Sequence, residues 1–144
     1  MLLAYLAGRR WWPRYAVPGT SNYEFALQRA RSVAPELLFM PRELERIRDS
    51  SGQELGCHSF SHLYLVEAGV TEQDFVIDLE AFAKVARRLR IDPVSYVFPR
   101  NQGQARHFRI LERHGYVAAR GNPPHWAYNS DSTSARAFRL ADAA

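Results

Sequence analysis

The chain of 144 residues is long enough for one domain with a sizeable core, and 47% hydrophobic with 24% charged residues is ordinary for a globular protein. No apolar run has the length of a membrane span, and the apolar start over residues 1–7 lacks the basic flank of a signal peptide, so we expect a cytoplasmic location. The net charge is +4, but the arginines are spread along the chain, so no nucleic-acid-binding patch is evident.

Proline, glycine and the spacing of apolar residues divide the chain into alternating helices and strands. Residues 11–35 hold three prolines and read as an irregular excursion with one helix over residues 23–33. The remaining predicted elements are a helix over 41–49, a strand over 53–57, a helix after residue 71, a strand over 94–98, a helix over 104–114 and a strand over 116–119. In the helix over 104–114 we expect Phe108 and Leu111 to point inward. Beyond these the chain turns polar, and we expect a loop and a short tail over residues 122–144.

The helix after residue 71 has the clearest pattern in the chain. Thr71 is a favourable N-cap, and Glu72 and Asp74 place negative charge near the positive end of the helix dipole. The apolar residues at helical spacing predict one buried stripe made of Phe75, Leu79, Phe82, Ala86 and Leu89. We interpret this helix as a packing element and assign no chemistry to it.

Three strands that alternate with helices are typical of a parallel sheet or barrel. In such folds the carboxyl ends of the strands gather the binding and catalytic groups. The ends of the three predicted strands carry His58 and His62, then Arg100 and Asn101, then Arg120. We therefore expect these side chains to share one rim of the sheet.

The two histidines, four positions apart, are the most distinctive feature of that rim. Neutral imidazole is the commonest protein ligand for zinc and similar ions, and such a pair can meet on one helix face or in a tight turn. Two exposed or hydrogen-bonded histidines without a ligand would give the same spacing. Along the preceding strand His58 shares a face with Glu54 and Gly56. Cys57 points the other way, and we favour a small buried residue over a ligand or a nucleophile.

Two stretches resemble motifs of one enzyme family. Residues 56–62, GCHSFSH, resemble the second motif of the polysaccharide deacetylases of the NodB-homology, carbohydrate esterase type, whose pattern is His-Ser/Thr-x-x-His. Residues 96–102, YVFPRNQ, resemble the third motif in a branch associated with surface-polysaccharide biosynthesis. The commoner form of that motif has its arginine before the proline, whereas here the arginine follows it. Residues 111–121 also resemble that branch, so the resemblance covers residues 35–121.

The resemblance implies an α/β fold, a partial (β/α) barrel with parallel strands and outer helices. It implies that His58 and His62 bind a divalent metal ion, with zinc as the expected identity, and that Ser59 holds their loop by a hydrogen bond. The implied activity is removal of N- or O-acetyl groups from a carbohydrate in polysaccharide metabolism or biosynthesis. In such enzymes the metal polarises the acetamide carbonyl and activates water.

The other positions on the rim are candidates for binding substrate, and two of them have a second interpretation. Arg100 would orient an acidic group or bind substrate, or else lie on the surface without a function. Asn101 would donate to a substrate carbonyl or cap the following helix. Arg120 is a third candidate for binding the carbohydrate substrate.

Two motifs of the family are missing from the sequence. An acidic pair that supplies the catalytic base and the third metal ligand should precede His58, but the only aspartate there is Asp49, in a charged helix end. The late Leu-x-His motif with the general acid is absent, since His125 lies in a different context. We therefore expect residues 1–144 to be a single partial deacetylase-like domain of low activity. A non-catalytic domain of the same fold and a basic nucleic-acid-binding module are the alternatives.

Overall fold

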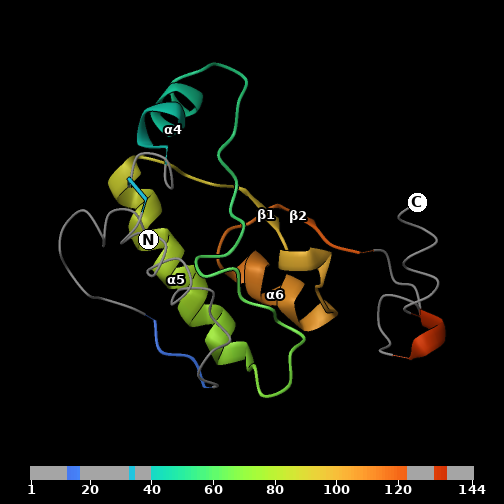
Figure 1. Ribbon diagram of the computed structural model, residues 1–144. Coiled ribbons are helices and arrows are strands. Elements are labelled where there is room, and N and C mark those ends of the chain that lie inside the picture. Colours follow the sequence, from blue (N-terminus) through green and yellow to red (C-terminus); the bar gives the residue numbers. More distant parts are fainter. Residues whose placement is uncertain (1–12, 17–32, 35–39, 123–131, 136–144) are drawn as a thin grey trace.

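The computed structural model describes residues 13–16, 33–34, 40–122 and 132–135. Their elements, in chain order, are α4 (Pro41–Arg48), α5 (Glu72–Leu89), β1 (Ser95–Val97), the 3-10 turn η1 (Pro99–Asn101), α6 (Ala105–Arg113) and β2 (Ala118–Arg120) (Figure 1). Nearly all of the helix expected over residues 23–33 lies outside the described residues. Of the expected tail beyond residue 122, residues 132–135 are described; they include a helical turn in which Ala135 is buried.

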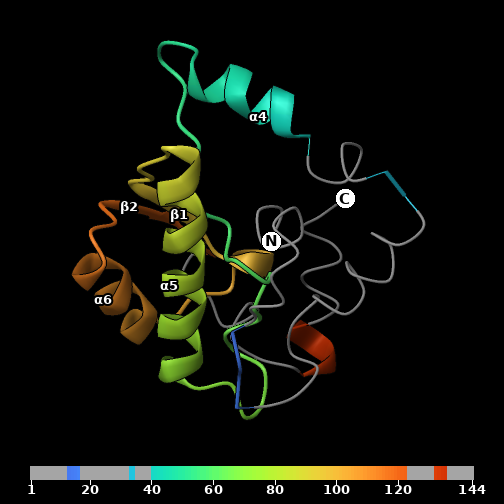
Figure 2. The ribbon, with the colours of Figure 1, turned by 90° about the vertical axis from the view of Figure 1, so that its left-hand side faces the viewer.

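Helix α5 lies beside α6 and packs against the sheet (Figures 1 and 2). It begins as predicted, because the Thr71 side chain accepts the backbone N–H of Asp74 while the Asp74 carboxylate accepts the backbone N–H of Thr71. Its predicted stripe faces the core: Phe75, Leu79 and Ala86 are buried, and Phe82 and Leu89 are half-buried. The core thus lies between α5, α6 and β1, where Tyr96, Phe98 and Leu111 join the stripe.

The sheet is parallel, as the alternation of strands and helices predicts. The paired residues of β1 and β2 are Ser95 with Ala118, Tyr96 with Ala119, and Val97 with Arg120. On the other side of β1, Cys57 forms an isolated parallel bridge with Tyr96. Strand β1 therefore lies between two parallel neighbours, and the partial barrel itself remains a prediction.

The strand predicted over residues 53–57 is reduced to that one bridge. The Cys57 N–H donates to the Ser95 carbonyl at 2.9 Å, and the Cys57 carbonyl accepts the Val97 N–H at 2.8 Å. Further back, the Glu54 side chain accepts the N–H groups of both Val94 and Ser95 at 2.9 and 2.8 Å. A carboxylate therefore occupies the donors that a longer backbone ladder would use.

Helix α6 and strand β2 differ from the sequence prediction in three details. The buried residues of α6 are His107, Ile110 and Leu111; Phe108 packs on the buried Phe98 ring, with centroids 5.1 Å apart, but remains 41% exposed. Asn101 does not cap the helix, because the N-cap is Gln104. Strand β2 begins two residues later than predicted, since residues 116 and 117 belong to the connection from α6.

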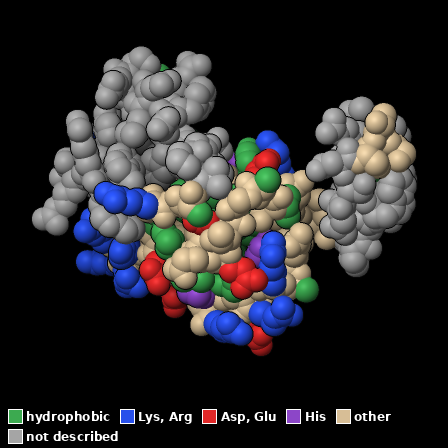
Figure 3. Space-filling view, turned by 90° about the horizontal axis from the view of Figure 1, so that it is seen from below, with side chains coloured by type: hydrophobic (Ala, Val, Ile, Leu, Met, Phe, Trp, Pro, Cys, Tyr) green, Lys and Arg blue, Asp and Glu red, His purple; other side chains and the backbone are tan. Residues whose placement is uncertain are grey.

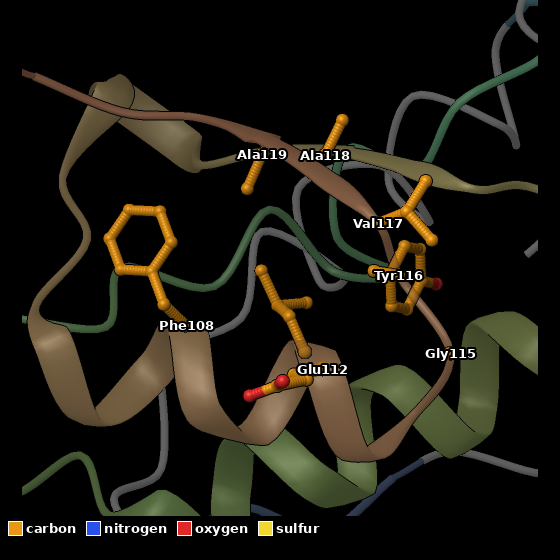
Figure 4. Close-up of a pocket in the computed structure, with 8 residues that line it drawn as sticks. Phe108, Glu112, Gly115, Tyr116, Val117, Ala118 and Ala119 are labelled. Atoms are coloured by element: carbon orange, nitrogen blue, oxygen red, sulfur yellow. The ribbon is translucent and has the colours of Figure 1, made fainter.

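An open hollow of about 400 Å³ lies between α6 and β2. Figure 4 shows Phe108 projecting from α6 toward the strand segment that carries Tyr116, Val117 and Ala119, and Glu112 also lines the hollow. None of the rim residues singled out from the sequence lines this hollow. In the described part of the chain, no helix combines the length and the apolar character needed to cross a membrane.

Candidate metal-binding site

His58 directly follows the bridge at Cys57, and its ring is held by the neighbouring strand. The Nδ1 atom lies 2.8 Å from the Val97 carbonyl oxygen. Because a carbonyl can only accept, Nδ1 must carry the proton, which leaves the lone pair of Nε2 free in the neutral ring. Histidines that bind metals usually donate their other ring N–H in this way, to a carbonyl or a carboxylate.

His62, at the far end of the loop, lies next to the His58 ring. The two imidazole centroids are 5.0 Å apart and the rings meet edge to face at 69°. Burial lowers the pKa of His62, and the positive charges of His58 and Arg100 lower it further. The neutral ring, which is the form that binds metal ions, is therefore favoured at His62.

A tight turn, and not a helix, brings the pair together. Ser59 and His62 both adopt left-handed backbone conformations, with φ of 64° and 58°. Each such residue costs on the order of 1–2 kcal/mol when its side chain has a Cβ atom. The loop therefore needs other contacts to hold it in this conformation.

Those contacts come from Asp78, a side chain of α5 with 0% exposure. Its Oδ2 accepts the Ser59 hydroxyl at 2.8 Å and the Phe60 N–H at 2.7 Å. Its Oδ1 accepts the Ser61 N–H at 3.0 Å and the Ser61 hydroxyl at 2.8 Å. The Tyr15 hydroxyl also donates to Oδ1, at 2.7 Å. Every residue between the two histidines is thus bonded to one buried carboxylate.

The Ser59 hydroxyl has a second contact that spans His62. Its Oγ accepts the backbone N–H of Leu63 at 2.9 Å while it donates to Asp78. The serine therefore ties the start of the loop to its end. The resemblance implies that Ser59 holds this loop. Asp78, the helix residue on which that role depends, was not recognised from the sequence.

Arg100 lies beside the pair on an aromatic support. Its guanidinium carbon is 3.7 Å from the centroid of the Tyr64 ring, and the same ring contacts His62 edge to face at 5.2 Å. One guanidinium nitrogen is also 3.6 Å from the Glu67 carboxylate. About half of the Arg100 side chain remains exposed.

Backbone pairing and hydrogen bonds place Arg120 and Asn101 at the end of the sheet that carries His58. Arg120 pairs with Val97, the residue whose carbonyl holds His58, and its own carbonyl accepts the Phe98 N–H at 3.0 Å. Asn101 has a left-handed φ of 55°, and its N–H donates to the Phe98 carbonyl at 2.8 Å. Arg120 is exposed and Asn101 is half-buried.

A third metal ligand is not found in the part of the chain that the structure describes, where no three His, Cys, Asp or Glu side chains form a group that could hold an ion. Cys57 is 1% exposed, and burial raises the pKa of its thiol to about 12. Asp49 lies at the end of α4 in an ion pair with Arg48 at 2.7 Å. Imidazole nitrogen is a ligand type that zinc takes, and a catalytic zinc site normally has three protein ligands and a water.

Comparisons with known proteins found no relative of this chain. No protein-family model, curated protein or solved structure matches the chain. The resemblance to polysaccharide deacetylases therefore depends on the motif residues themselves, above all on residues 56–62 and 96–102.

Proposed function

We propose that this chain is a metal-dependent hydrolase of the polysaccharide deacetylase type, which removes N- or O-acetyl groups from a carbohydrate. The observation that carries the proposal is the histidine pair: two imidazoles in edge-to-face contact, with Nδ1 of His58 donating to the Val97 carbonyl. The hydrogen bond at Nδ1 leaves Nε2 of His58 as the atom that would bind the ion. Zinc is the ion proposed.

The surrounding residues suit an acetylated sugar as ligand. An ion at the pair would supply Lewis-acid chemistry, polarising the acetyl carbonyl and lowering the pKa of water. Arg100, supported on the Tyr64 ring, offers a positive charge to an oxyanion or to an acidic substituent of the sugar. Asn101 and Arg120 lie at the same end of the sheet and are proposed to contact the carbohydrate.

The lack of a third ligand among the described residues favours a second candidate, a non-catalytic domain of the same fold that binds carbohydrate without hydrolysing it. A nucleic-acid-binding module has less support. On the face that Figure 3 shows, the lysine and arginine side chains of the described residues alternate with acidic ones and do not merge into one stripe.

An acetate-release assay tests the proposal. The full chain is incubated with zinc and an N-acetylated oligosaccharide, beside the variants His58→Ala and His114→Ala. His114 is the matched control, because its Nδ1 also bonds a backbone carbonyl, that of Ile110 at 2.8 Å, at the end of α6. We expect slow release that requires zinc, disappears in His58→Ala and persists in His114→Ala.

Each other result has a separate meaning. Oligosaccharide binding without zinc-dependent release would replace the proposal by the non-catalytic candidate. Release that is insensitive to His58→Ala, or neither release nor binding, would contradict both. Rapid release abolished by His58→Ala would show that the third ligand and the base come from within residues 1–144, against our expectation of low activity.

A further inference from the structure

Asp78 is a buried acidic residue that neither the motif resemblance nor the proposed chemistry uses. A carboxylate is costly to bury unless hydrogen bonds satisfy it, and an apolar residue of similar size would suit the α5 stripe better on packing grounds alone. The neighbours of Asp78 on that stripe, Phe75 and Leu79, are apolar and fully buried. Its presence there therefore indicates a role for the hydrogen bonds that its oxygens accept.

The contacts of Asp78 with the loop are confined to the segment between the two histidines. The carboxylate accepts the backbone N–H groups of Phe60 and Ser61 and the hydroxyls of Ser59 and Ser61. Through Ser59 the network reaches Leu63 N–H, on the far side of His62. Both ends of the histidine loop are thus fixed relative to α5.

The other anchor of the site is the Val97 carbonyl, which orients the His58 ring from β1. A loop with two left-handed residues between these anchors has few other ways to keep the two imidazoles together. We propose that Asp78 is a positioning residue of the histidine pair: it holds residues 59–61 so that both rings present a nitrogen to one ion. The ion itself rests on the proposed function, whereas the positioning of the rings does not.

The decisive variant is Asp78→Asn, which keeps the size of the side chain and replaces one acceptor oxygen by an NH2 donor. The hydroxyls of Ser59 and Ser61 can reverse their roles, but the backbone N–H groups of Phe60 and Ser61 cannot. One of the two N–H groups therefore loses its acceptor, and the loop shifts.

Asp74→Asn is the matched control. Asp74 lies one turn earlier on α5 and is also buried, at 2% exposure. Its carboxylate accepts the N–H groups of Ala16 and Thr71 and the Thr71 hydroxyl, and none of these partners belongs to the histidine loop. The control therefore reproduces the loss of a buried carboxylate on the same helix without removing a bond to residues 58–62; its partner Ala16 adjoins Tyr15, which donates to Asp78.

Two readouts separate positioning from general stability. Imidazole proton–nitrogen correlation spectra of the metal-free protein report ring environment and tautomer at His58 and His62. Zinc titration reports affinity. We expect Asp78→Asn to move both ring signals and to weaken zinc binding about tenfold or more, whereas Asp74→Asn lowers the melting temperature and leaves both readouts unchanged. Should Asp78→Asn fail to fold, Ser61→Ala removes one bond to the same carboxylate and is expected to give smaller shifts in the same direction.

Ring signals and zinc affinity that stay as in the control would overturn the positioning role. Ring signals that move in a protein whose wild type binds no zinc would keep that role and would instead overturn the metal site of the proposed function. The two proposals therefore fail separately.

Discussion

Protonation of His107 should destabilise the fold as the pH falls. The ring is 2% exposed and packs edge to face against Phe75, with a centroid distance of 5.6 Å. Its Nδ1 accepts the backbone N–H of Gln104 at 3.1 Å, a bond that a proton on Nδ1 would break. Burial, and secondarily the charge of Arg106, lower the pKa of His107 from 6.5 to about 4.

The pH window and the magnitude follow from that shift. A histidine with a lower pKa in the folded state binds protons more readily when unfolded, so its contribution is intact above pH 6.5 and is lost progressively as the pH falls toward 4. At about 1.4 kcal/mol per pKa unit, the loss between neutral pH and a pH near 4.5 is about 2 kcal/mol.

Urea unfolding of the wild type and of His107→Leu, at several pH values from about 7 to 4.5, measures the effect. Leucine removes the titrating group and keeps an apolar side chain in the core. We expect the wild type to lose about 2 kcal/mol more than the variant over that range, although the variant starts lower because Gln104 loses its acceptor. Parallel pH profiles for the two proteins would refute the reasoning.

Three further predictions concern single positions. Cys57, the one cysteine, should resist alkylation by iodoacetamide near neutral pH until the chain is unfolded, because burial raises its pKa to about 12; rapid labelling of the native chain would contradict its placement. Gly103→Ala should lower the free energy of unfolding by about 1–3 kcal/mol, because the new Cβ would lie 2.6 Å from the Phe98 ring; a loss no larger than that of Gly121→Ala, whose Cβ would approach its neighbours no closer than 3.4 Å, would count against this packing. Thr71→Ala should cost about 1 kcal/mol in urea unfolding through the lost cap of α5, and an unchanged midpoint would argue against the capping box.

The sequence predicted those elements whose local signals agree with their environment. Helix α5 follows from its Thr71 cap and its apolar stripe, and the parallel order of the strands follows from their alternation with helices. The helix over residues 41–49 is found as α4. The convergence of His58 and His62 was accessible from spacing alone, although only the structure shows that a turn produces it.

Three features that the sequence did not reveal involve polar side chains in backbone or core positions. Glu54 replaces a strand partner for β1, so the predicted strand shrinks to a bridge. His107 occupies a core position on α6 that the spacing of apolar residues does not reveal, whereas Phe108 stays 41% exposed. Asp78 was passed over in a helix interpreted as packing alone. Its signal was present in the sequence, because it falls within the apolar stripe beside Phe75 and Leu79, where an acidic residue needs a partner.

The central claim is that His58 and His62 together hold one metal ion, and a zinc titration of the full chain tests it most directly. Isothermal calorimetry of the wild type, His58→Ala, His62→Ala and His114→Ala gives stoichiometry and affinity. We predict one zinc per chain, bound weakly because the described residues supply only two ligands. Either substitution in the pair should abolish this binding, and His114→Ala should preserve it. Zinc binding that survives both substitutions in the pair, or an absence of binding in the wild type, would contradict the claim.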